Sequence, residues 1–139
     1  MMPNPAPGRS GPNPAPGRSG PNPAPGRSGL GHVPSISIAE IPDGAYILDV
    51  REDHEWVAGH APHAQHLPMQ HVPVRLAEIP TEGNVVVACR MGGRSAQVTA
   101  YLLAQGWDNV VNLDGGMLAW EAAGRPLVAS DVDQTPQVV

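Results

Sequence analysis

Two short apolar runs constrain the fold of this chain more than any other feature. Residues 45–50 (AYILDV) and 84–89 (NVVVAC) are nearly continuous stretches of apolar side chains, rich in β-branched residues in the second run. Runs of this kind are typical of strands that are covered on both faces. Residues 51–59 and 95–105 follow them with helical patterns, and each pattern stops at or just before a glycine. Strands that alternate with helices predict an α/β fold with a mainly parallel sheet.

The remaining segments complete this pattern. Residues 35–41 alternate polar and apolar side chains and predict a first strand, whereas residues 64–68 form a brief extended piece. A short helix is expected around residues 74–79, a further strand at 109–113 and a last helix at 117–123. We therefore expect a central sheet of about five strands with helices on both faces.

One domain fits the length of 139 residues, and we place it at residues 33–128. Residues 1–32 contain three perfect copies of PNPAPGRSG, a unit without large apolar side chains, and predict a disordered Pro/Gly-rich tail. This tail could be a ligand for a partner domain. We favour a tandem duplication, or a start codon placed too early, because disorder is the default for this composition. Residues 129–139 are expected to form a flexible C-terminal tail.

The charge and the cysteine content exclude several classes of protein. The chain has no lysine and a net charge of −5, and the part after the repeats keeps five arginines against 13 acids. So acidic a domain is a poor candidate for binding nucleic acid or an anionic membrane. The single cysteine leaves no internal disulfide and no paired-cysteine site. With neither a membrane-spanning run nor a secretory signal in the sequence, we expect a soluble cytoplasmic protein without a cofactor.

Cys89 is that single cysteine, and it stands where the second apolar run ends and a loop begins. Active groups of open parallel sheets gather at the carboxyl ends of strands. Gly92 and Gly93 allow the loop to curl back, so that its N–H groups can form a nest for an anion. Ser95 is expected to open a helix whose N-terminus adds partial positive charge.

Arg90 and Arg94 add two full positive charges to this loop. All of these features favour the sulfur of Cys89 as an anion. Such surroundings lower the pKa of a cysteine from about 8.5 to between about 3.5 and 7.5, and the thiolate is the nucleophile. The alternative is an inert core cysteine, but such a residue needs neither two glycines nor two arginines beside it.

Two other anion-binding chemistries compete for this loop. A nucleotide-binding P-loop requires a lysine, and the chain has none. Cysteine phosphatases place an arginine six positions after the cysteine, whereas Arg94 follows Cys89 by five and Ser95 by six. The loop is therefore one residue short for a phosphate group.

Two further sets of polar residues are candidates for a role. Asp49 and Arg51 end the first apolar run at the edge of the sheet where Cys89 is expected, so they either brace the loop or form an ordinary ion pair. Five histidines lie between residues 54 and 71, but Pro62 and Pro68 interrupt any helix that could gather them. We therefore expect no metal site.

Four motifs together resemble the rhodanese family of sulfurtransferases, in the family's order and spacing. They are CRMGGRS at residues 89–95, ILDVRE at 47–52, GHAPHAQHLP at 59–68 and LDGGMLAWEAAGRPL at 113–127. The resemblance implies a single rhodanese-like domain whose active loop comprises Cys89 and residues 90–95.

The resemblance also implies a mechanism. The Cys89 thiolate takes a sulfur from a donor such as thiosulfate, holds it as a persulfide cradled by the amides of the loop, and passes it to cyanide, a thiol or a protein cysteine. Arg90 and Arg94 would guide the anionic donor. Met91 replaces a polar or charged residue that many members carry at the loop tip, which favours a persulfide over thiosulfate as donor. The alternatives are a non-catalytic binding or regulatory module with this fold and, less favoured, a cysteine phosphatase or arsenate reductase.

Overall fold

We describe the protein from a computed structural model, which describes residues 33–139. The predicted N-terminal tail lies outside these residues. The strands and helices are β1 (Ser35–Ile36), β2 (Tyr46–Asp49), α1 (Asp53–Ala58), β3 (Gln65–His66), β4 (Val85–Ala88), α2 (Gly93–Ala104), β5 (Val110–Leu113) and α3 (Gly116–Ala122). Three short 3₁₀ helices complete the set: η2 (Ile38–Glu40), η3 (Met69–Val74) and η4 (Leu76–Glu78).

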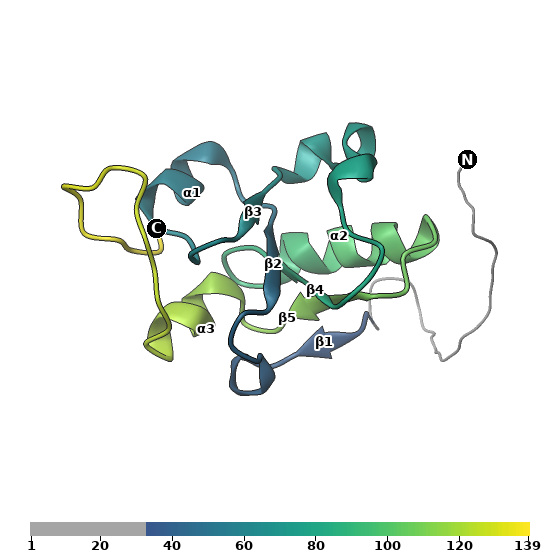
Figure 1. Cartoon of the computed structure of the whole chain (residues 1–139), viewed down its shortest axis with the longest axis horizontal. Helices are drawn as coiled ribbons and strands as arrows, with labels where there is room; N and C mark the ends of the chain where they lie inside the picture. The colour runs from purple at the N-terminus through teal and green to yellow at the C-terminus, as the bar shows by residue number, and fades with distance from the viewer. Residues whose placement is uncertain (1–32) are drawn as a thin grey trace.

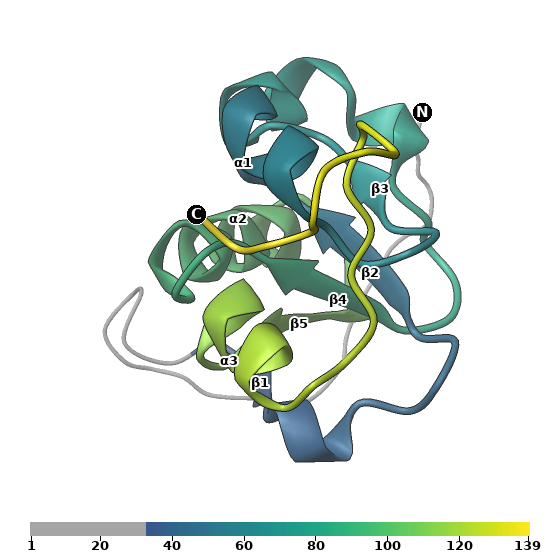
Figure 2. The ribbon, with the colours of Figure 1, turned by 90° about the vertical axis from the view of Figure 1, so that its left-hand side faces the viewer.

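The five strands form one sheet in the order β1-β5-β4-β2-β3, and every neighbouring pair is parallel. Figure 1 shows β4 in the middle of this sheet, and Figure 2 shows α1 and α2 on one face with α3 on the other. The predicted α/β class, with about five strands and helices on both faces, is confirmed. Because all strands are parallel, their carboxyl ends lie along one edge, where Asp49 ends β2 and Cys89 follows β4.

The side chains of β4 alternate between two hydrophobic clusters, as a covered strand requires. Val85, Val87 and Cys89 pack in the cluster that includes Val98 and Leu102 of α2. The intervening residues of the strand pack in a second cluster with Met117 and Trp120 of α3; they are Val86 and Ala88. This alternation places the sulfur of Cys89 beneath α2.

Two predicted elements differ from the structure. Only Ser35–Ile36 of the expected strand 35–41 pairs with β5, because the Glu40 carboxylate accepts hydrogen bonds from the N–H and hydroxyl of Ser37 and turns the chain into η2. The helix expected at residues 74–79 is replaced by η3 and η4. η3 ends at its C-cap, Arg75, whose φ of −125° and ψ of 27° interrupt the helical path before η4 begins.

The last eleven residues, expected to form a flexible tail, lie against the domain without helix or strand structure (Figure 2). The N–H groups of Ser130 and Gln137 donate to the carbonyls of Val57 and Ala58 in α1. A Cβ on Gly59 would stand 2.4 Å from the main-chain oxygen of Gln137, so this glycine permits the close approach. Among residues 33–139 no helix has the length and apolar character needed to cross a membrane.

Candidate active site

Cys89 follows the middle strand directly, and its side chain is only 1% exposed. Two groups hydrogen-bond to its sulfur: the N–H of Gly92 at 3.1 Å and the hydroxyl of Ser95 at 3.3 Å. Gly92 has a φ of 112°, a left-handed conformation in which a residue with a side chain would be strained. This conformation lets the loop turn back toward the strand. The expected curl of the loop around the sulfur is therefore present.

The α2 helix begins at Gly93, two residues earlier than expected, so Ser95 sits within its first turn. Burial by itself raises the pKa of the Cys89 thiol. The polar groups around the sulfur, which are the hydroxyl and amide of Ser95 and the amides of Gly92 and Met91, outweigh burial, and the net pKa is lowered. The surroundings of the buried sulfur thus shift its equilibrium toward the thiolate.

Gly116 at the start of α3 holds the other side of the loop. The N–H groups of Met117 and Leu118 donate to the carbonyls of Cys89 and Arg90, at 2.8 and 3.0 Å. A Cβ on Gly116 would lie 2.5 Å from the carbonyl oxygen of Arg90, closer than any real contact. The second glycine of the DGG turn is therefore required by the approach of α3 to the active loop.

Arg94 points toward α1 and binds both carboxylate oxygens of Glu55, at 2.7 and 2.9 Å. The hydrogen bond from Arg94 lowers the pKa of Glu55 to about 2, although burial opposes the shift. Much of the positive charge of Arg94 is therefore matched by a carboxylate. We expected this arginine to be available for an anionic donor; instead, the structure places it in a two-point ion pair.

Arg90 and Met91 lie on the outside of the loop. The Nε–H of Arg90 donates to the main-chain oxygen of Val139 at 3.0 Å, which ties the C-terminal segment to the active loop. Met91 is 64% exposed, an unusual position for a large apolar side chain beside a buried cysteine. Within the described residues, the hydrogen bonds to the sulfur come from Gly92 and Ser95, and neither guanidinium reaches it.

Asp49 and Arg51 form an ion pair at 2.7 Å with both side chains fully buried. Arg51 also donates to the carbonyl of Gly59 at 2.8 Å, so the pair joins the end of β2 to the end of α1. Its connection to the active loop is indirect, because the charge of Arg51 helps to keep Glu55 ionised and Glu55 in turn holds Arg94. The ion pair is therefore present, whereas a bracing role toward the active loop stays a prediction.

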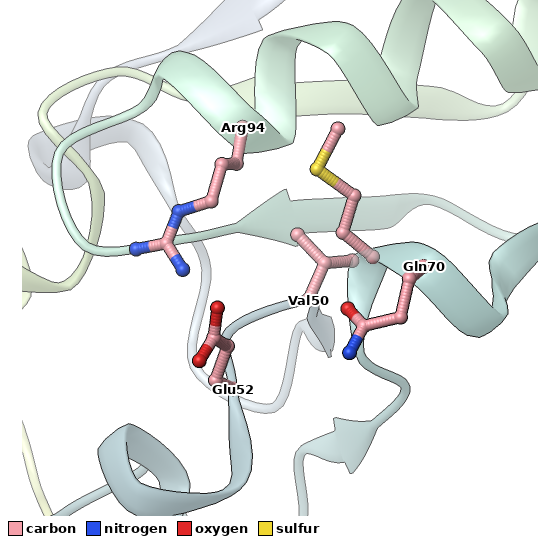
Figure 3. A pocket seen from close by; sticks show the side chains of 5 residues that line it. Val50, Glu52, Gln70 and Arg94 are labelled. Atoms are coloured by element: carbon pink, nitrogen blue, oxygen red, sulfur yellow. The ribbon is translucent and has the colours of Figure 1, made fainter.

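Beside the loop lies an open pocket of about 280 Å³ (Figure 3). Its lining residues are Val50, Glu52, Met69, Gln70 and Arg94. In Figure 3, Arg94 reaches in from α2, while Glu52 and Gln70 extend from the other segments that line the pocket. The pocket therefore combines an apolar surface with an acid, an amide and a guanidinium that is already paired.

The histidines do not gather into a metal site among the described residues. Instead, the Trp56 ring is stacked against His60 and His66, with centroid distances of 3.6 and 4.6 Å. Trp56 is thus partly exposed within an aromatic stack. The two imidazole rings are held by hydrogen bonds, from His60 to the carbonyl of Trp56 and from His66 to the carbonyl of Arg51.

Sequence reasoning missed two residues of the site, Glu55 and Asn112. Glu55 is an acid buried to 6% exposure in the first turn of α1, and Asn112 is an amide buried to 6% exposure inside β5. A polar residue within the apolar run VVNL was a visible signal for Asn112. No comparable signal marked Glu55 among the other acids of its helix.

Comparisons with known proteins agree with this geometry. A family model described as "Rhodanese-like domain" matches residues 37–123. A protein named sulfurtransferase from Allochromatium vinosum is 45% identical over 85 residues, which cover 61% of this chain and 79% of that protein. The thiosulfate sulfurtransferase GlpE of Stutzerimonas stutzeri is 34% identical over 94 residues, covering 68% of this chain and 83% of that protein. The crystal structure of a rhodanese-related protein from Thermoplasma volcanium superposes with a TM-score of 0.62 at 28% identity, covering 68% of this chain and 97% of that one.

Proposed function

Because this chain belongs to the rhodanese-like domain family, we propose that it is a sulfurtransferase that carries sulfur as a persulfide on Cys89. The observation that carries the proposal is the buried sulfur at the end of β4, which accepts hydrogen bonds from Gly92 and Ser95. These donors stabilise an anion on sulfur, whether thiolate or persulfide. The relatives named sulfurtransferase support the same class of reaction.

The reaction has two displacement steps. In the first, the Cys89 thiolate attacks the outer, sulfane sulfur of the donor; a new S–S bond forms, and the donor's own bond to that sulfur breaks. With thiosulfate the leaving group is sulfite, which departs with the electron pair. In the second step a nucleophile attacks the terminal sulfur, and the thiolate is restored as the S–S bond breaks. The chain holds one cysteine, so the acceptor is an external thiol, cyanide or a protein cysteine.

Charges around the loop favour a persulfide as donor over thiosulfate. Thiosulfate is a dianion. It would approach a site where Arg94 is already paired with the Glu55 carboxylate and where a second acid, Glu52, lines the neighbouring pocket. The exposed Met91 offers an apolar contact instead of a charge. A persulfide donor carries at most one charge on its reacting sulfur pair and has a carbon chain behind it that can contact Met91, so it suits this surface better.

Intact-mass measurement tests the proposal. The protein is incubated with thiosulfate or with glutathione persulfide, freed of donor, and then treated with cyanide or a thiol. We expect Cys89 to gain one sulfur atom, more readily from the persulfide, and to lose it to the acceptor. The matched control is Cys89→Ser, which should gain nothing. A wild-type protein that gains no sulfur from either donor would refute the proposal and leave the non-catalytic module as the better account.

A further inference from the structure

Asn112 is a buried polar residue in an otherwise apolar strand. In β5, Val110 belongs to the cluster beneath α2, and Asn112, two residues on, points to the same face. In the sheet register Asn112 is paired with Val87 of β4, two residues before Cys89. An amide that is only 6% exposed requires hydrogen-bond partners, and the available partner lies toward the active loop.

That partner is Ser95, itself fully buried. The Ser95 hydroxyl oxygen lies 2.5 Å from Oδ1 of Asn112 and 3.3 Å from the sulfur of Cys89. In both contacts the hydroxyl is the donor, yet a hydroxyl has only one proton to donate. The two acceptors therefore compete for the same proton, and what Asn112 does decides whether the sulfur receives it.

We infer that Asn112 is a positioning residue that controls the hydrogen bond between Ser95 and the sulfur of Cys89. An amide suits this position because it carries an acceptor and a donor side by side. With Oδ1 toward Ser95, the hydroxyl proton is held by the amide, an arrangement that suits a protonated thiol. A half-turn of the amide presents its NH₂ group to the Ser95 oxygen and frees the hydroxyl proton for an anionic sulfur. A chain of donors in this second arrangement also polarises the last hydrogen bond and strengthens it.

Other groups that act on the sulfur are left in place by a change at Asn112. Arg94 of α2 and its partner Glu55 of α1 face the loop, Arg90 lies on its outer side, and Glu52 lines the adjacent pocket. The α3 amides are bound to the carbonyls of the loop. An effect of Asn112 on the sulfur that passes through Ser95 can therefore be isolated from these charges.

The test is a double-variant cycle that needs no sulfur donor, so its result is independent of the proposed sulfur transfer. The rate of Cys89 alkylation by iodoacetamide is measured across a pH series for wild type, Asn112→Leu, Ser95→Ala and the double variant. Leu has nearly the shape of Asn and lacks both hydrogen-bonding groups. We expect Asn112→Leu to slow alkylation roughly threefold at a pH below the thiol's pKa and to shift the pH profile to higher pH, because it removes the NH₂ donor that the anionic state needs. Faster alkylation would mean that the amide only withholds the Ser95 proton, and it would overturn the inference.

In the Ser95→Ala background the same change at Asn112 should have no further effect, because the hydroxyl that transmits it is gone. Equal slowing in both backgrounds would show a general packing effect and overturn the inference, as would no slowing in either.

Asn112→Asp provides a second variant that keeps the shape. Its carboxylate can only accept the Ser95 proton, so it should slow alkylation more than Leu does, and by more in the presence of Ser95 than in its absence. An Asp effect of equal size in both backgrounds would mean a simple charge effect and would also contradict the inference.

Discussion

Arg94 donates hydrogen bonds to both carboxylate oxygens of Glu55, and this pair joins the first turn of α2 to the first turn of α1. It determines how much positive charge the active loop presents. The two arginines of the loop predict a strongly positive charge from the sequence. In the folded protein, the charge of one of them, Arg94, is neutralised by the buried Glu55. The proposed preference for a persulfide donor rests on that match.

Replacing Glu55 with Gln should improve the use of thiosulfate. The charge of Arg94, which interacts favourably with that of Cys89, would then act on an incoming dianion without a competing carboxylate. We expect kcat/KM for thiosulfate to rise about three- to tenfold, with a smaller change for glutathione persulfide. Steady-state assays with both donors measure this, and Glu82→Gln, an exposed acid, serves as the control. An unchanged or lower value for thiosulfate would show that Arg94 does not meet the donor.

Acid should weaken the fold partly through the same carboxylate. Hydrogen bonding from Arg94 lowers the pKa of Glu55 to about 2, below the ordinary value of 4.5. A carboxyl whose folded-state pKa is lowered stabilises the fold above its ordinary pKa, and this contribution is lost as the pH falls toward the folded-state value. Urea unfolding at pH values between about 6 and about 3 should show a steeper loss for wild type than for Glu55→Gln. If the free energy of unfolding fell equally with pH in both proteins, the lowered pKa would not belong to Glu55.

Gly116→Ala should disturb the active loop, beyond the strain of its backbone conformation. Gly116 has a φ of 61°, and a Cβ there would meet the carbonyl oxygens of Arg90 and Cys89 at 2.5 and 2.6 Å. Gly83 is the matched control, since it has a φ of 71° with nothing within 4 Å of a Cβ. We expect Gly116→Ala to cost about 1–3 kcal/mol more than Gly83→Ala in free energy of unfolding, and it alone should slow Cys89 alkylation. Equal costs from denaturant unfolding would argue against the close contact.

Asp49→Ala should be strongly destabilising, because it leaves the fully buried Arg51 without its partner. Breaking a buried pair in this way typically costs about 3–5 kcal/mol. Glu78→Ala removes one partner of the exposed pair with Arg75 and should change stability little. Chemical denaturation of both variants makes the comparison, and a small effect at Asp49 would mean that solvent reaches Arg51.

Sequence reasoning succeeded where the physics is local. The valine run before Cys89 predicted β4, because β-branched side chains covered on both faces favour a strand. The glycines at 92 and 93 predicted a loop that turns back on the sulfur, and Gly92 adopts a conformation that favours glycine. Local physics also explains the failures, since the Ser37–Glu40 hydrogen bonds replaced the second half of a predicted strand.

The sequence by itself determined the class of fold, the position of Cys89 at a strand end and the family motifs around it, because periodicity and glycine placement act over a few neighbouring residues. Only the tertiary structure decided which side chains surround that cysteine. Glu55 and Asn112 reach Arg94 and Ser95 from other elements of the fold, at separations of 39 and 17 residues. Contacts at such separations depend on how the parallel strands are ordered and how the helices pack on them, which no local pattern records.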